Sequence, residues 1–204
     1  MHRMNLDTLW DSDKMALAIN PKQNKNSHGV VTCGELSKST CQRIILEHKK
    51  EIHQKVKGRI QKDKKFVLDK KRDVDVWVID ESATWIDEII INSIYTALEY
   101  LDYDVVGLLE RPQLLRYNAP SVGYDWHTDL GEEETSTRKI SLSIALNDEY
   151  EGGNIAFFSN KLFEHKMPIG QSLAFPSFLS HRVMPITKGE RWALVAWISG
   201  TPFR

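Results

Sequence analysis

The chain has few cysteines, no long apolar run and almost no net charge. It contains only two cysteines, Cys33 and Cys41, and neither belongs to a CxxC motif. A structural zinc site usually needs four Cys or His ligands, so we expect two reduced and mostly buried thiols. No apolar run approaches the roughly 18–20 residues that a membrane-spanning helix needs. The net charge of -1 favours no particular class of partner.

The first residues also lack the continuous apolar stretch of a secretory signal peptide, so we expect a cytoplasmic location. No internal repeat or low-complexity segment is visible. A chain of 204 residues with 41% hydrophobic composition suits one domain with a sizeable core. We therefore divide it into a polar, irregular N-terminal arm or short leading strand, residues 1–34, and one folded domain, residues 35–204.

Helical periodicity is confined to the first half of the chain. Ser39 and Gln42 have the spacing of a capping box, and the residues that follow predict a helix over residues 39–57. A second stripe of apolar residues predicts a helix over residues 84–101. Between the two helices, VWVID at residues 76–80 indicates a short strand.

Residues 49–72, KKEIHQKVKGRIQKDKKFVLDKKR, form a basic run. We favour a solvated helix face and loop, while an anion-attracting rim near a substrate stays open. Phe66 is the one aromatic residue in the run. Nucleic-acid surfaces use several aromatic side chains on which bases stack, so we do not favour that partner.

The pattern changes from Val105 onward. Short runs rich in β-branched and aromatic residues alternate with turn residues, for example around Asn118–Pro120 and Asp148–Gly153. Helices followed by a series of strands predict an α+β chain. The arrangement we expect is an all-β sandwich or barrel with the helices packed on one side.

The segment YDWHTDLG holds the first candidate for chemistry. His127 and Asp129 are two residues apart, and alternate side chains of a strand point to the same face, so an imidazole and a carboxylate converge there. The triplet alone is a weak signal because the chain has seven histidines. A surface pair at a strand end would explain it equally well.

His181, in FPSFLSHRVMP, is the third candidate ligand. It begins a strand-like run after a turn with proline, and a remote strand can deliver a side chain to the same point. Two imidazoles and one carboxylate form the facial triad that leaves positions open and suits non-haem Fe(II). A core histidine with satisfied hydrogen bonds is the alternative.

Arg191 begins the apolar strand RWALVAWIS, where it would share a face with Ala193, Val195 and Trp197. A charge that points into a barrel is costly unless it is paired. A guanidinium is suited to bidentate binding of a carboxylate. The distal carboxylate of 2-oxoglutarate is one such partner, and an Asp or Glu of the protein is the other.

Aromatic residues surround these candidates in the sequence. Tyr117 precedes His127 by ten residues and is able to donate its hydroxyl group to a buried carboxylate. Tyr124 and Trp197 are candidates for the walls of a substrate site, although interior packing explains a tyrosine as well. Trp126 lies between the two residues of the HxD triplet, so it should point away from them.

The stretches GELSKSTCQRII, QLLRYNAPSVGYDWHTDLG, RKISLSIALNDEYEGGNI and FPSFLSHRVMPITKGERWALVAWISG resemble the prolyl 4-hydroxylase type of Fe(II)/2-oxoglutarate-dependent dioxygenases. The resemblance is strongest to the short PKHD-type microbial and phage branch and covers roughly residues 34–204. The pattern of that family is HxD, a long gap, His and a basic residue about ten positions later. It maps onto His127, Asp129, His181 and Arg191, and the tyrosine that touches 2-oxoglutarate in the family matches Tyr117.

The resemblance implies a double-stranded β-helix (jelly roll) from about residue 105, with both helices packed on the larger sheet. It also implies that residues 35–204 form a single dioxygenase domain that uses Fe(II), 2-oxoglutarate and O2. The implied reaction is the hydroxylation of an unactivated C–H bond, coupled to decarboxylation of 2-oxoglutarate to succinate. A prolyl residue in a peptide or protein, or an amino-acid-like unit, is the expected substrate, and nucleic acid is not expected.

Two departures limit this assignment. Many peptidyl prolyl 4-hydroxylases have Lys where this chain has Arg191, and no separate peptide-binding domain is apparent, so a collagen-type substrate is not favoured. The alternatives are hydroxylation of a free amino acid or small metabolite, nucleic-acid demethylation, and a cupin-like binding module without turnover. A halogenase is disfavoured because Asp129 stands where related halogenases have a small residue. The polar, acidic loop 131–138 is expected to be mobile and to close over an extended substrate.

Overall fold

The structure is a computed structural model. It describes residues 29–49, 73–159 and 161–203 with their side chains, and residues 55–57, 59–62 and 65–68 as backbone strands. Within these residues, no helix has the length and apolar character needed to span a bilayer. The described helices are α2 (Lys38–His48) and α3 (Thr84–Leu98), and a 3-10 turn covers Glu133–Thr137.

Most of the strands belong to one large sheet with the order β1-β12-β8-β14-β6-β5-β2, and β9 is added beside β14. Its strands are β1 (Val31–Glu35), β2 (Lys55–Lys57), β5 (Asp75–Val78), β6 (Gln113–Asn118), β8 (Arg138–Ala145), β9 (Tyr150–Gly152), β12 (Gln171–Pro176) and β14 (Ile186–Ser199). A smaller sheet has the order β11-β10-β13-β7. Its strands are β7 (Tyr124–His127), β10 (Ile155–Phe158), β11 (Leu162–His165) and β13 (Ser180–Val183). A separate pair consists of β3 (Arg59–Lys62) and β4 (Lys65–Leu68).

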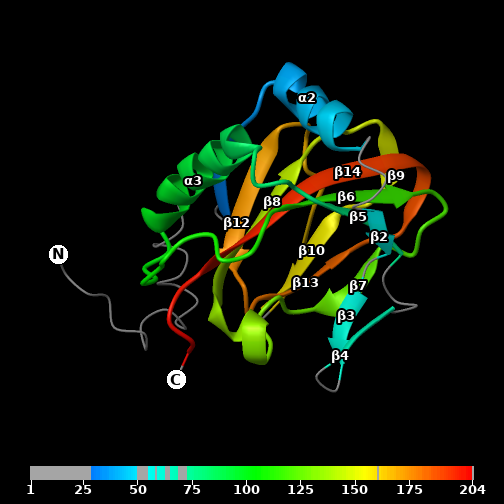
Figure 1. Cartoon of the computed structure of the whole chain (residues 1–204). Helices are drawn as coiled ribbons and strands as arrows, with labels where there is room; N and C mark the ends of the chain where they lie inside the picture. The colour runs from blue at the N-terminus through cyan, green and yellow to red at the C-terminus, as the bar shows by residue number, and fades with distance from the viewer. Residues whose placement is uncertain are drawn as a thin grey trace.

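The predicted α+β architecture is confirmed. All the strand pairs between described residues are antiparallel, so both larger sheets are antiparallel and neither is a parallel βαβ sheet. The main series of strands begins at β6, close to the predicted change of pattern at Val105. In Figure 1 α2 lies at the top and α3 at the left, β13 and β7 lie in the lower part of the view, and β14 and β6 lie between α2 and these two strands.

The alternation of side chains on β14 divides the interior into two regions. Trp192, Leu194, Ala196 and Ile198 are buried in one cluster with apolar residues of α2 and α3. The residues that alternate with them therefore point to the opposite face of the large sheet. They are Arg191, Ala193, Val195 and Trp197. The helices consequently cover one face, and the other face is left for the smaller sheet.

The prediction of a first helix over residues 39–57 is wrong for its second half. The helix ends at His48, and residues 55–57 form a strand that pairs with β5. Its N-cap is Ser37 and not Ser39, because the Ser37 hydroxyl group accepts a hydrogen bond from the backbone N–H three residues later. The alternation of Lys and Val at residues 55–57 fits the period of a strand, and pairing with β5 decides between the two structures.

The other elements lie close to their predicted positions. The second helix ends three residues earlier than predicted, and the strand expected at residues 76–80 is β5, one residue earlier at its start. Strand β1 crosses the predicted boundary between arm and domain, and residues 1–28 lie outside the described residues. Part of the basic run 49–72 forms strands β2, β3 and β4 where we expected a helix face and loop. The side chains of residues 51–72 lie outside the description.

Truncation of a core residue of β14 should destabilise the fold. Leu194 is fully buried at the centre of the large sheet, where it is paired with Leu114 on one side and Ile144 on the other. We expect Leu194→Ala to lower the free energy of unfolding by about 2–5 kcal/mol, measured by urea denaturation. The control is Leu109→Ala, at a residue 63% exposed, which should change stability by less than about 0.5 kcal/mol. Equal effects of the two variants would contradict this packing.

Candidate metal centre and co-substrate site

Strands β7 and β13 bring two histidines together. His127 is the last residue of β7, and His181 is its direct partner on β13. The centroids of the two imidazole rings lie 4.2 Å apart. The His181 side chain is buried and packs edge-on against Phe175, with 4.7 Å between ring centroids. His181 therefore lies in the interior beside His127, although the two residues are 54 positions apart in the sequence.

Both imidazoles are oriented by backbone carbonyl groups. Nδ1 of His127 lies 2.7 Å from the carbonyl oxygen of Asp125, and Nδ1 of His181 lies 2.9 Å from that of Leu179. A carbonyl oxygen only accepts hydrogen bonds, so each Nδ1 carries the proton and donates. Each Nε2 then keeps a lone pair in the neutral ring, which is the arrangement typical of histidines that bind metals.

Asp129 completes the cluster. Its Oδ1 lies 3.7 Å from Nε2 of His127, and its Oδ2 lies 3.6 Å from Nε2 of His181. One ligand atom from each of the three residues lies within 4.8 Å of the others. The hydroxyl group of Ser141 donates to Oδ2 of Asp129 at 2.6 Å, from the large sheet.

The electrostatic environment keeps the Asp129 carboxyl group ionised. Burial alone raises its pKa, but the imidazoles of His181 and His127 and the Ser141 hydroxyl group outweigh this effect and lower the pKa to about 2. The carboxylate is therefore an acceptor with no proton to lose at neutral pH. Two imidazole nitrogens and one carboxylate oxygen at this separation fit a divalent first-row ion, and they are the donor set that suits non-haem Fe(II).

Arg191 and Tyr117 lie on the face of the large sheet that the candidate metal centre uses. The two residues are paired across β14 and β6, and Ser141, which contacts Asp129, is paired with Trp197 six residues further along β14. An even separation along a strand places Arg191 and Trp197 on one face. That face contains the candidate ligand set.

The Arg191 guanidinium is buried, and among the described residues it has no carboxylate partner. Its Nε donates to the carbonyl oxygen of Gly153 at 3.0 Å, and its guanidinium carbon lies 5.5 Å from the centroid of the Tyr117 ring. A side chain at Gly153 would be crowded, since a Cβ there would lie 2.9 Å from a ring carbon of Tyr150 and 3.0 Å from Cδ of Arg191. Gly153 also has a φ of +66°, a conformation that favours glycine. The guanidinium is thus buried and oriented by a backbone carbonyl group.

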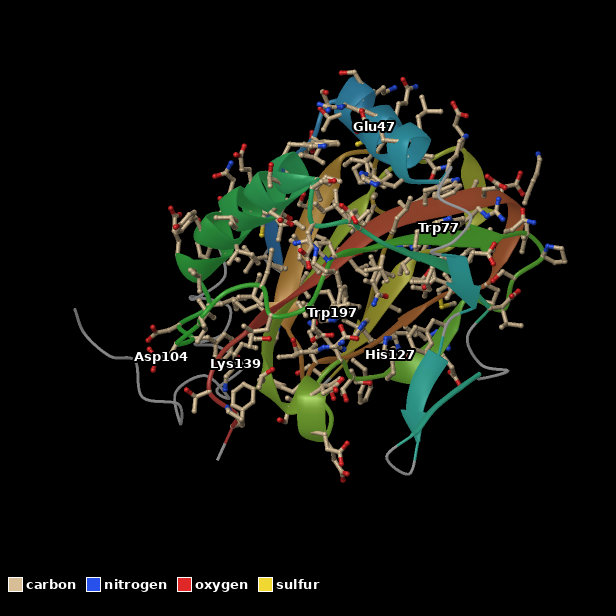
Figure 2. The ribbon with its side chains drawn as sticks, in the orientation of Figure 1. Glu47, Trp77, Asp104, His127, Lys139 and Trp197 are labelled. Carbon is tan, nitrogen blue, oxygen red and sulfur yellow. The ribbon has the colours of Figure 1, made fainter. Side chains whose placement is uncertain are left out.

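The predicted wall residues border the cluster. Tyr124 stacks on His127, with 3.5 Å between ring centroids, and Trp197 is buried beneath the guanidinium of Arg138 at 3.9 Å. Figure 2 shows His127 and Trp197 close together in the view and far from Glu47 on α2. Trp126 is 38% exposed and contacts Phe158, so it points away from the cluster as the alternation of side chains predicts.

The sequence analysis missed three residues that contact the candidate ligands or support them. They are Ser141, Ser177 and Arg138, whose guanidinium also donates to the backbone carbonyl of Asp129 at 3.2 Å. The alternation of serine with apolar residues in KISLSIAL was a usable signal for Ser141, because the polar residues occupy one face of a buried strand. No comparable pattern identifies Ser177.

Comparison with known proteins finds similarity in sequence and in fold. Residues 112–199 match the family model of the 2OG-Fe(II) oxygenase superfamily. Two solved structures have the same fold as this chain. A prolyl-4-hydroxylase of Pseudomonas putida has a TM-score of 0.65 at 18% identity, covering 91% of this chain and 98% of that protein. A prolyl hydroxylase from Trichoplax adhaerens, in complex with a peptide fragment of the hypoxia inducible factor oxygen degradation domain, has a TM-score of 0.69 at 17% identity, covering 97% and 94%.

Curated relatives carry a more specific name. A PKHD-type hydroxylase of Synechococcus sp. strain CC9902 is 37% identical over 79 residues, which cover 37% of this chain and 36% of the relative. A PKHD-type hydroxylase of Thermosynechococcus vestitus is 32% identical over 114 residues, 52% of this chain and 48% of the relative. The chain thus spans less than half the length of the curated relatives it matches. The predicted resemblance is confirmed for the superfamily, with distant homologues among the PKHD-type hydroxylases.

We expect the metal-free protein to bind one divalent first-row ion through this cluster. Asp129→Ala should weaken the binding of Co(II), followed by visible absorption, by more than the roughly 10–100-fold typical of losing an outer-shell partner. The matched control is Asp125→Ala, at an exposed carboxylate of β7 four residues earlier, because it keeps the carbonyl oxygen that orients His127. Unchanged Co(II) affinity in Asp129→Ala would show that the metal binds elsewhere.

Proposed function

We propose that this chain is an Fe(II)- and 2-oxoglutarate-dependent oxygenase that hydroxylates an unactivated C–H bond, with a prolyl residue of a peptide or protein as its substrate. One observation carries the proposal. Ligand atoms of His127, Asp129 and His181 gather within 4.8 Å, on the face where the buried Arg191 has no carboxylate partner among the described residues. This arrangement is suited to bind a metal ion and a dicarboxylate side by side. The cytoplasmic location expected from the sequence stays a prediction.

In this proposal the residues of the chain mainly bind and orient. When bound, Fe(II) and 2-oxoglutarate supply the oxidising chemistry, in which O2 is consumed, 2-oxoglutarate becomes succinate and CO2, and one oxygen atom enters the substrate. His127, Asp129 and His181 would hold the iron. Arg191 would bind the distal carboxylate of 2-oxoglutarate, with the Tyr117 hydroxyl group as a second donor. The buried aromatic rings around His181 exclude water, which strengthens these charged interactions.

The prolyl substrate is supported by the names of the similar proteins. Both solved structures described above are prolyl hydroxylases, and the Trichoplax adhaerens protein is bound to a peptide. The aromatic wall made by Tyr124 and Trp197 suits an apolar ring such as that of proline. The loop that follows the HxD triplet forms a 3-10 turn at residues 133–137 with exposed acidic residues, and Arg138, which follows the turn, lies over the ring of Trp197.

Arg191 should determine the affinity for the co-substrate. Arg191→Gln removes the charge, and hydrogen bonds to charged groups contribute roughly 1.5–3 kcal/mol, so the KM for 2-oxoglutarate should rise about 10–100-fold. The control is Arg116→Gln, because Arg116 on the same sheet is paired with Asp75 at 2.7 Å and with Glu190 at 3.3 Å. That variant should lose thermal stability with little change in KM. The reverse pattern would contradict the role of Arg191.

The substrate class can be tested with a panel under identical conditions. The enzyme with Fe(II), 2-oxoglutarate and O2 is incubated with proline-containing peptides, free proline, and methylated single-stranded DNA. We expect succinate release to be stimulated by the peptides, with a gain of one oxygen atom in the peptide by mass spectrometry. Stimulation by free proline alone would move the substrate to a free amino acid, and stimulation by DNA alone would indicate demethylation. No succinate under any condition would favour a binding module.

A further inference from the structure

Two buried serines connect the candidate iron-binding carboxylate to the interior of the large sheet. Ser141 on β8 is 2% exposed, and Ser177, which follows β12, is fully buried. Their hydroxyl oxygens lie 3.0 Å apart, and Ser141 also contacts Oδ2 of Asp129 at 2.6 Å. A buried hydroxyl group without a partner is costly, so these contacts account for the presence of two serines in an apolar interior.

The direction of the hydrogen bonds follows from the chemistry of the groups. An ionised carboxylate only accepts, so the single hydroxyl proton of Ser141 is donated to Asp129. Ser141 must then act as the acceptor towards Ser177, which donates its own proton. The chain therefore runs from Ser177 to Ser141 to Asp129, and each bond polarises the next.

Ser177 also holds the backbone of the same aspartate. Its carbonyl oxygen accepts hydrogen bonds from the backbone N–H groups of Asp129 and Leu130, both at 2.9 Å. Its own N–H donates to the carbonyl oxygen of Lys139 at 3.0 Å, which ties this turn to β8. Asp129 lies after the end of β7, where strand pairing no longer fixes it. The Ser177 carbonyl fixes its main chain, and the serine chain fixes its carboxylate.

We propose that Ser141 and Ser177 are positioning residues for metal binding, in which Ser177 acts on Asp129 through Ser141. The pair fixes Oδ2, so that the carboxylate can offer Oδ1 as a single ligand atom. This inference rests on the proposed function, because it takes Asp129 as a ligand of the iron. Outer-shell partners of metal ligands typically change metal affinity by about 10–100-fold when they are removed.

The test is a Co(II) titration of metal-free protein, followed by visible absorption, in parallel with thermal unfolding of the metal-free variants. Ser141→Ala should weaken Co(II) binding by about 10–100-fold, and Ser177→Ala should weaken it less, because Ser141 can still donate. The double variant should be no weaker than Ser141→Ala, since Ser177 has no route to the carboxylate without Ser141. Ser141→Thr keeps the hydroxyl group and should retain most of the affinity.

The control is Ser172→Ala, at a buried serine on β12 paired with Ile144, which faces the helices. It should leave Co(II) affinity unchanged. The inference would be overturned if Ser141→Ala bound Co(II) as tightly as the wild-type protein. It would also be overturned if Ser177→Ala reduced Co(II) affinity as much in the Ser141→Ala background as in the wild-type background. A loss of unfolding temperature without a loss of Co(II) affinity would also overturn it, because it would show a structural role alone. If Ser141→Ala does not fold, Ser177→Ala and Ser141→Thr decide the matter. Failure of the wild-type protein to bind Co(II) would refute the proposed function as well.

Discussion

His127 and His181 face each other as direct partners in the antiparallel pair of β7 and β13, and the candidate site depends on this register. Side chains alternate along a strand, so a shift of one residue would turn an imidazole to the outer face. That face is occupied by Trp126, whose ring lies 5.4 Å from the guanidinium carbon of Arg182. Backbone pairing thus fixes two candidate ligands, and the link from Asp129 to Ser141 attaches the third to the opposite sheet. The candidate site lies where the two sheets are joined.

The same alternation separates two arginines on the large sheet. Arg116 lies beside Trp192, on the side of the helices, and carboxylates of Asp75 and Glu190 neutralise it. Arg191, one residue away from Trp192, points to the other face and has no such partner among the described residues. A buried charge is costly unless it is paired. The difference between two neighbouring arginines of one sheet therefore indicates a carboxylate that the chain does not itself supply.

Periodicity and spacing predicted the parts of the structure that local sequence controls. The strand period after Val105 and the apolar stripe of α3 were visible, and the HxD triplet with a later histidine and arginine marked the residues that the sheets bring together. The local sequence pattern did not predict structure that depends on contacts with residues distant in the sequence. Residues 55–57 became a strand because β5 pairs with them. Ser177 could not be identified because its contacts with Asp129 and Ser141 exist only after β7, β8 and β12 have assembled.

The charges of the site are set before any ligand arrives. Asp129 is ionised, because the imidazoles and the Ser141 hydroxyl group hold its pKa at about 2 against the effect of burial. Carbonyl groups hold a proton on Nδ1 of each imidazole, so each Nε2 is the nitrogen that lies next to Asp129. At the other end of the same face, Arg191 keeps a positive charge and an orientation fixed by Gly153. A negative centre and a positive centre on one dry face are complementary to a cation and a carboxylate that bind side by side. This layout follows from the folded chain alone, because the groups that orient these charges are backbone carbonyl groups and buried hydroxyl groups of the chain itself.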